Sequence, residues 1–127
     1  MIDFTNGAYV KLKQTSPEAV IKDVQPLLIN GEQVISAYKG IRDYVVFTDK
    51  RVIAVNVQGM TGKKKDFTSL PYSKISAFSV ETAGVFDLDS ELEMYFSGLG
   101  KVKFEFTGES NIVQIGQIIG SYAMQKS

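Results

Sequence analysis

Three consecutive lysines are the residues of this sequence best suited to bind an anion. Lys63, Lys64 and Lys65 follow Gly59 and Gly62, and glycine lets a backbone come close to a phosphate or a lipid headgroup. Near an anionic leaflet each lysine contributes roughly 1 kcal/mol, about 3 kcal/mol for the run. The run therefore predicts a weak anion or lipid patch in a single copy of the chain, and the alternative is a solvated turn.

The same glycines do not make a nucleotide-binding loop. A phosphate-binding loop of the Gly-x-x-x-x-Gly-Lys-Ser/Thr type needs four residues between its glycines and a hydroxyl residue after the lysine. Here two residues separate Gly59 from Gly62, and Lys64 follows Lys63. We therefore expect no nucleotide cofactor.

Four acidic residues alternate along a later segment and raise the question of a calcium site. They are Asp87, Asp89, Glu91 and Glu93. A calcium loop of the EF-hand type that began at Asp87 would need a glycine where Leu92 stands. A period of two is typical of the solvent face of a strand, along which such residues lie roughly 6–7 Å apart. We therefore interpret the acids as a solvated strand face and expect no metal site.

The chain contains no histidine and no cysteine, which removes several kinds of chemistry. Zinc sites with Cys and His ligands, Ser-His-Asp triads and Cys-His pairs are all impossible. Acid–base catalysis would fall to a carboxylate, a lysine or a tyrosine with a strongly shifted pKa, and no pairing of acids supports such a site. We expect a protein that is not an enzyme, and the lack of cysteine suits a cytoplasmic location.

Length and charge set further limits. The 127 residues are enough for one domain spanning residues 1–127. Fourteen basic residues offset fourteen acidic ones, so no long-range attraction favours nucleic acid, and we expect none as a partner. The first ten residues lack the apolar stretch of a signal peptide, and no apolar run approaches the roughly 20 residues of a spanning helix.

The elements that must position these residues are short strands between two helices. Thr15 and Glu18 form a possible capping box and Pro17 suits a first turn, which predicts a helix from there to about residue 28. Five strands are expected over residues 33–39, 43–48, 51–57, 66–72 and 75–81, and two more in a hairpin ending near residue 106. A final helix spans about residues 110–124, where Gly116 and Gly120 permit close packing onto the chain's own sheet or onto another subunit.

The hairpin formed by residues 43–57 is apolar on both faces. A two-residue turn pairs Phe47 with Val52, which places two sets of four residues on opposite faces. One face carries Val45, Phe47, Val52 and Ala54, and the other carries Tyr44, Val46, Ile53 and Val55. A sheet with one face in water should alternate, so either the N-terminal helix or a second copy covers the outer face. Tyr44, Val46, Ile53 and Val55 are therefore a candidate oligomer interface.

The last hairpin is predicted with a definite register. Gly100 suits the left-handed position of a three-residue loop. That loop pairs Met94 with Phe104 on the buried face and sets Glu93 opposite Glu105 on the solvent face.

Five motifs, in this order, resemble those of the bacterial pleckstrin-homology family. They are Arg42-Asp43, Phe47-Thr48-Asp49-Lys50-Arg51, residues 58–64, Leu70-Pro71-Tyr72 and residues 81–89. The resemblance implies a mostly β fold of seven strands in a sandwich or barrel with a C-terminal helix, to which this chain adds an N-terminal helix. It also implies association into closed rings, and it brings no established ligand.

The eukaryotic relatives that bind phosphoinositides use basic residues between their first two strands. Here that loop is short, Lys39-Gly40-Ile41-Arg42 followed by Asp43, and the tryptophan typical of their last helix is absent. Phosphoinositide binding is therefore not carried over. The expected function is a non-enzymatic scaffold or interaction module that assembles into a homo-oligomeric ring and contacts an unidentified protein partner. The alternative is a peripheral membrane module that binds anionic lipid through Lys63, Lys64 and Lys65.

Overall fold

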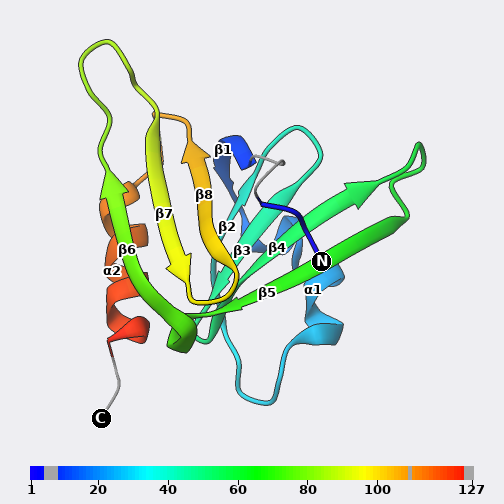
Figure 1. Ribbon diagram of the computed structural model, residues 1–127. Coiled ribbons are helices and arrows are strands. Elements are labelled where there is room, and N and C mark those ends of the chain that lie inside the picture. The colour runs from blue at the N-terminus through cyan, green and yellow to red at the C-terminus, as the bar shows by residue number, and fades with distance from the viewer. Residues whose placement is uncertain (5–8, 109, 125–127) are drawn as a thin grey trace.

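The computed structural model describes residues 1–4, 9–108 and 110–124, which form strands, short helical turns and one longer helix (Figure 1). The strands are β1 (Tyr9–Thr15), β2 (Val34–Lys39), β3 (Tyr44–Thr48), β4 (Arg51–Gln58), β5 (Lys64–Pro71), β6 (Ile75–Glu81), β7 (Ser90–Phe96) and β8 (Gly100–Phe106). The helices are α1 (Ile21–Val24) and α2 (Ile112–Ala123), and 3-10 turns cover Pro17–Ala19, Gln25–Leu27 and Tyr72–Lys74.

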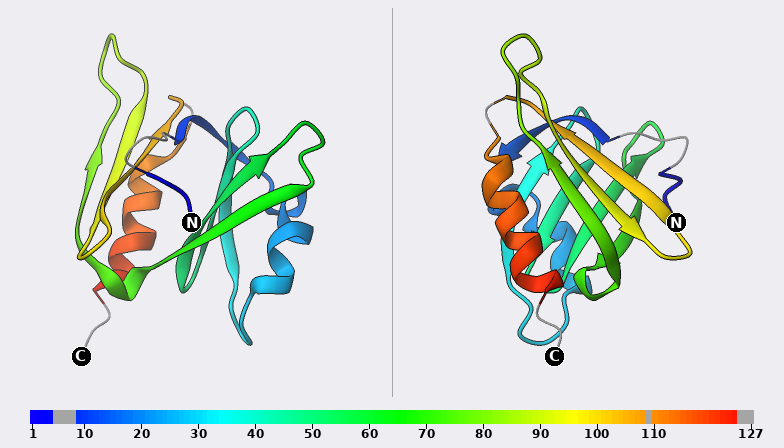
Figure 2. Two further views of the ribbon diagram at one scale, coloured as in Figure 1. Left: turned by 45° about the vertical axis from the view of Figure 1, so that its right-hand side comes forward. Right: turned by 60° about the vertical axis from the view of Figure 1, so that its left-hand side comes forward.

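The strands form one sheet in the order β5-β4-β3-β2-β1-β8-β7-β6. All neighbours are antiparallel except β1 and β8, which are parallel. The sheet folds over, so that the half containing β2 to β5 faces the half containing β6 to β8, and α2 packs at the open corner (Figure 2). The predicted mostly β fold with a C-terminal helix is confirmed, and the seven expected strands are β2 to β8.

The eighth strand, β1, lies in a segment for which the sequence predicted no element. Its buried side chains are Tyr9 and Leu12, three residues apart, whereas a regular strand repeats every two. The register of β1 against β8 shifts between these residues, and Lys11 has a φ of 57°. This irregularity removes the alternation by which a strand is recognised in sequence, although β1 joins the two halves of the sheet.

The N-terminal helical segment differs from the prediction in its details. Thr15 is the last residue of β1, and Ser16 precedes the first turn without making a side-chain hydrogen bond to the backbone there. Instead the Ser16 hydroxyl donates to the Glu18 carboxylate, so the capping box does not form. Pro26 restricts the α-helix to one short piece, because a proline inside a helix removes a hydrogen bond.

The two predicted hairpin registers have different outcomes. The pairing of Phe47 with Val52 across β3 and β4 is confirmed. The register predicted for β7 and β8 is wrong by two residues, since Met94 pairs with Val102 and Glu91 faces Glu105. The loop has the predicted three residues but begins one residue earlier: the Leu99 amide donates to the Phe96 carbonyl at 3.2 Å, and Phe96 pairs with Gly100. A shift of two residues keeps every side chain on its predicted face.

The glycines of α2 face the chain's own sheet. A Cβ atom built on Gly116 would lie 3.0 Å from Val80 Cγ2, and one on Gly120 would lie 3.7 Å from Phe78 Cζ. Both neighbours belong to β6. Of the two interpretations of these glycines, the structure shows close packing of the helix onto its own sheet.

Candidate functional site

Three hairpin loops project from one end of the molecule: those joining β2 to β3, β4 to β5 and β6 to β7 (Figures 1 and 2). The candidate lysines lie in the second of them. Lys63 is exposed next to the tip, Lys64 and Lys65 begin β5, and Lys64 is exposed whereas Lys65 is half-buried. Lys64 pairs with Gln58 and Lys65 with Val57, so consecutive residues point to opposite faces of the hairpin. The structure therefore divides the lysine run, and only Lys63 and Lys64 are exposed.

Arg42, which the sequence analysis did not assign to the lysine loop, contacts that loop. The Arg42 guanidinium, in the turn between β2 and β3, donates to the Gly59 carbonyl. The next residue, Asp43, accepts a hydrogen bond at 2.8 Å from the Val57 amide. These bonds fix the short turn against the longer hairpin, and they add a third cation to the two exposed lysines. The predicted pairing of β3 with β4 brings these two turns near each other, but it does not indicate that the Arg42 side chain donates to the Gly59 carbonyl.

The four candidate interface residues lie inside the chain. Tyr44 is 4% exposed, and Val46, Ile53 and Val55 are completely buried. The N-terminal segment covers them through Val20 and Val24. The interpretation that something must cover this face is therefore right, and the chain's own segment does so. These residues contact another copy only if that segment moves away, and their role in self-association stays a prediction.

The N-terminal segment that covers this face also makes a polar contact with it. The Tyr44 hydroxyl donates to the Asp23 carboxylate at 2.7 Å. Burial, together with that bond and the negative charge of Asp23, raises the pKa of Tyr44 well above its usual range. Tyr44 is therefore a neutral hydrogen-bond donor at physiological pH, which suits a structural role.

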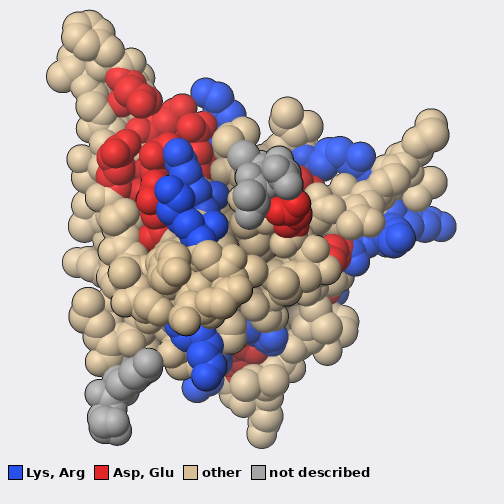
Figure 3. Space-filling model, viewed as in Figure 1, with Lys and Arg blue, Asp and Glu red and all other residues tan. Residues whose placement is uncertain are grey.

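Of the alternating acids, Glu91 and Glu93 lie on β7, whereas Asp87 and Asp89 precede that strand, and three of the four pair with lysines. Lys103 Nζ lies 3.0 Å from a Glu91 oxygen, and Lys101 Nζ lies 3.8 Å from a Glu93 oxygen. Lys11 on β1 pairs with Asp89 at 3.2 Å. Figure 3 shows acidic atoms gathered over the half of the sheet containing β6 to β8 and basic atoms along the β4–β5 hairpin. The two ends of the sheet thus differ in charge, although the chain is neutral.

A shallow depression of about 290 Å³ lies beside the β2–β3 turn. Its lining includes Tyr9, Leu12, Ile41, Arg42, Asp43 and Val57. The Tyr9 hydroxyl is buried and has no hydrogen-bond partner among the described residues, and burial raises its pKa. Over the same part of the chain, no group of three or more acidic side chains is arranged to hold a metal ion.

The edge strand β6 is the other surface of interest. It pairs with β7 on one side and, within the described residues, with no strand on the other. From Ile75 to Val80 it carries no charge, and Ser76, Ala77 and Ser79 are exposed. The opposite edge, β5, carries Lys64, Lys65, Asp66 and Pro71, residues that discourage edge-to-edge pairing. Between Ile75 and Val80, β6 carries no charge or proline of this kind, and its one charged residue is Glu81 at the end of the strand.

No helix in the described ranges is long and apolar enough to cross a membrane. Residues 3–123 match the model of a family described as "Bacterial PH domain". Two proteins of Bacillus subtilis (strain 168), both named as uncharacterized, are similar to the chain. YjqA is 45% identical over 95% of this chain and 98% of its own length, and YozO is 32% identical over 77% and 84%.

Two solved structures are similar in both sequence and shape. A DUF1696 family protein with a pleckstrin-homology domain from Shewanella loihica PV-4 is 36% identical, with a TM-score of 0.78 over 90% of this chain and 98% of that chain. A pleckstrin homology domain from Shewanella amazonensis SB2B is 37% identical, with a TM-score of 0.66 over 93% and 92%.

Proposed function

The chain belongs to the bacterial PH domain family, and from this membership we propose that it is a non-enzymatic interaction module whose copies assemble into a closed ring. The observation that carries the proposal is the edge of β6, which is uncharged from Ile75 to Val80 and pairs with no second strand among the described residues. An edge strand presents a row of unpaired backbone donors and acceptors, and it is a template for pairing with another chain. The absence of cysteine is compatible with a cytoplasmic location.

A ring requires β6 of one copy to meet a surface of the next copy other than that copy's own β6, because pairing of β6 with β6 would give a two-fold dimer. If β6 of one copy meets a different surface of the next copy, the contact is head-to-tail, and such contacts close into rings when the rotation permits. The groove beside β6, lined by Ile75, Phe78, Ala123 and Met124 on β6 and the end of α2, offers apolar surface next to the edge. Apolar surface adds to the stability that backbone pairing provides.

Light scattering after size exclusion, at tens of micromolar protein, tests this proposal. We expect a mass of several multiples of 14.0 kDa. Ser79→Lys places a charge on the edge strand and should shift the mass toward one chain. Val113→Lys adds the same charge at an exposed position of α2 and should keep the assembly. A wild-type mass of one chain would contradict self-association, and a mass of two chains would contradict the ring.

A second candidate function is peripheral binding to anionic membrane. It is supported by the cluster of Arg42, Lys63 and Lys64 at a projecting end of the molecule, and Arg42 is held there by its bond to Gly59. Each cation near an anionic leaflet contributes roughly 1 kcal/mol. A ring with all copies oriented alike would multiply this weak attraction.

Flotation with phosphatidylglycerol vesicles at low salt tests the second candidate. We expect the wild-type chain to float with the vesicles and to be released by salt, since exposed charges are screened. Replacing Lys63, Lys64 and Lys65 by glutamate should abolish flotation. The control is the replacement of Lys101 and Lys103 by glutamate. These lysines pair with acids on β7, so flotation should change little. Equal flotation on uncharged phosphatidylcholine vesicles would argue against an anion site.

A further inference from the structure

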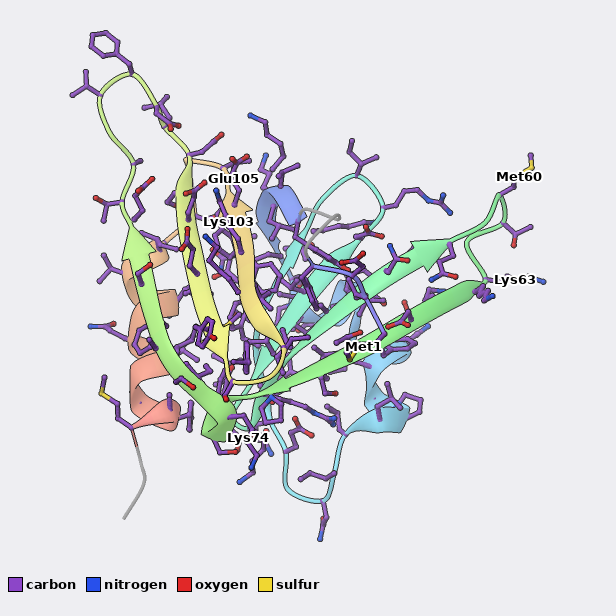
Figure 4. The ribbon with its side chains drawn as sticks, in the orientation of Figure 1. Met1, Met60, Lys63, Lys74, Lys103 and Glu105 are labelled. Carbon is purple, nitrogen blue, oxygen red and sulfur yellow. The ribbon has the colours of Figure 1, made fainter. Side chains whose placement is uncertain are left out.

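Two loop tips at the basic end carry large apolar side chains that contact almost nothing. Ile41, in the β2–β3 turn, is 96% exposed, and Met60, at the tip of the β4–β5 hairpin, is fully exposed. Figure 4 shows Met60 and Lys63 pointing away from the body of the protein. Single exposed apolar residues are common on surfaces. A pair at the tips of two projecting loops next to three cations is a more specific arrangement.

A side-chain hydrogen bond joins the two loops that carry these tips. The Arg42 guanidinium bonds the Gly59 carbonyl, and a Cβ atom on Gly62 would lie 3.6 Å from Arg42 Nη2 and 3.2 Å from Val57 Cγ1. Gly59 and Gly62 have φ values of 75° and 71°, which other residues adopt at a cost. The sequence thus builds a turn that presents Met60 outward while Arg42 packs beneath it.

The charges around the tips indicate which surface they meet. Arg42 follows Ile41, and Lys63 and Lys64 follow the Met60 turn. A lipid interface accepts this combination, because apolar side chains enter the boundary between headgroups and acyl chains while cations contact phosphates. A flat interface also meets separate projecting tips at the same time. The β6–β7 loop projects from the same end with Phe86 exposed, but Glu81 and Asp87 flank it.

We propose that Ile41 and Met60 insert into the headgroup region of an anionic bilayer, while Arg42, Lys63 and Lys64 contact the lipid phosphates. This inference rests on the second candidate function and names its apolar anchors. Insertion adds a contribution that salt does not screen, whereas the attraction of the cations is screened. A partial salt resistance of binding is therefore part of the proposal.

The chain contains no tryptophan, so an indole introduced at position 60 reports on that position alone. With vesicles of phosphatidylcholine and phosphatidylglycerol in equal parts, Met60→Trp should shift its emission to the blue and be quenched by lipids brominated on the acyl chain. Val113→Trp, at an exposed site on α2, should show neither change. A blue shift without lipid that grows with protein concentration would place the tip against another protein and overturn the proposal.

Partitioning measurements on serine variants complete the test. Ile41→Ser and Met60→Ser should each lower the vesicle partition coefficient by about tenfold, the effect of losing one buried apolar side chain. Phe86→Ser, in the acidic loop, should change it by less than about twofold. Binding without an indole shift or without loss in the serine variants would overturn insertion and leave the electrostatic function standing. Absence of vesicle binding by the wild-type chain would overturn both.

Discussion

Replacing Arg51 by methionine is expected to lower the free energy of unfolding by about 3–5 kcal/mol, the effect of leaving one member of a buried ion pair alone. Arg51, at the start of β4, makes two hydrogen bonds of 2.9 Å to the Glu32 carboxylate. Thr48 donates to the same carboxylate at 2.6 Å, and the Ile29 amide donates at 3.1 Å. The Glu32 side chain is completely buried and the Arg51 side chain is 18% exposed, so the carboxylate left without Arg51 is largely shielded from water.

The double variant distinguishes the contribution of the ion pair to stability from the cost of leaving one charge unpaired. Glu32→Met combined with Arg51→Met should recover most of the loss, because replacing both members of a buried pair with apolar residues is often neutral. Lys50→Met removes the same charge from an exposed neighbouring position and should change stability by less than about 0.5 kcal/mol. Urea unfolding of the four proteins measures these differences. An Arg51→Met loss no larger than that of Lys50→Met would show that the pair does not stabilise the fold.

Acid titration gives a second signature of the same pair. Burial by itself raises the pKa of Glu32, but the hydrogen bonds from Arg51, Thr48 and the Ile29 amide together lower it below its usual value. The stability that the ionised carboxylate contributes is present above its unfolded pKa, roughly 4.3, and is lost as the pH falls through the folded value. In Arg51→Met the carboxylate has lost the Arg51 hydrogen bonds, so burial has the larger effect on the pKa of Glu32 and raises it. The difference in the free energy of unfolding between this variant and wild type should therefore shrink at low pH, where Glu32 is protonated in both proteins. A constant difference down to acid pH would contradict this account.

Val24→Asp is expected to destabilise the protein by about 3 kcal/mol or more. Val24 is completely buried in α1 and packs on the outer face that carries Tyr44, Val46, Ile53 and Val55. An unpaired carboxylate there is too costly to remain folded in place. We expect the segment to detach and expose the apolar face, which should appear as increased binding of an apolar dye and a greater tendency to associate.

Gln25→Asp is the matched control, since it adds the same charge at an exposed position directly after α1. It should change stability by less than about 0.5 kcal/mol. If Val24→Asp were as mild as Gln25→Asp, the segment would not cover its own sheet in solution. The outer face would then belong to a contact with a second copy, as the original interpretation of these four residues allowed.

Most strands could be predicted because the sequence patterns that indicate them are local. Alternation on β7 and β8 and the two-sided apolar pattern on β3 and β4 follow from the period of a strand, and the two-residue turn fixes the register between β3 and β4. The register of β7 and β8 was missed because two three-residue loops, one ending before Gly100 and one including it, fit the same glycines. β1 was missed because its bulge at Lys11 removes the alternation.

The candidate site could be predicted only in part from the sequence. The sequence located the basic loop, but it could not show that Lys64 and Lys65 face opposite sides of the hairpin, since that depends on where β5 begins. It also gave no reason to connect Arg42 with Gly59, or Glu32 with Arg51, because both contacts join residues that lie on different elements. An acid beside a turn and a base at a strand end are common in sequence and become a buried pair only through packing.

The sequence by itself determined which kinds of chemistry are excluded, that the architecture is mostly β, and that the outer face of the β3–β4 hairpin is apolar. Composition settles the first, because a chain without histidine and cysteine lacks their ligands and nucleophiles. Periodicity settles the other two, because a residue's face depends on its position along a strand. Only the tertiary structure decided that Val20 and Val24 cover that face, that β6 pairs with a single strand among the described residues, and that Ile41 and Met60 lie beside one cluster of cations. These features depend on contacts between segments far apart in the chain, whose free energy no local pattern encodes.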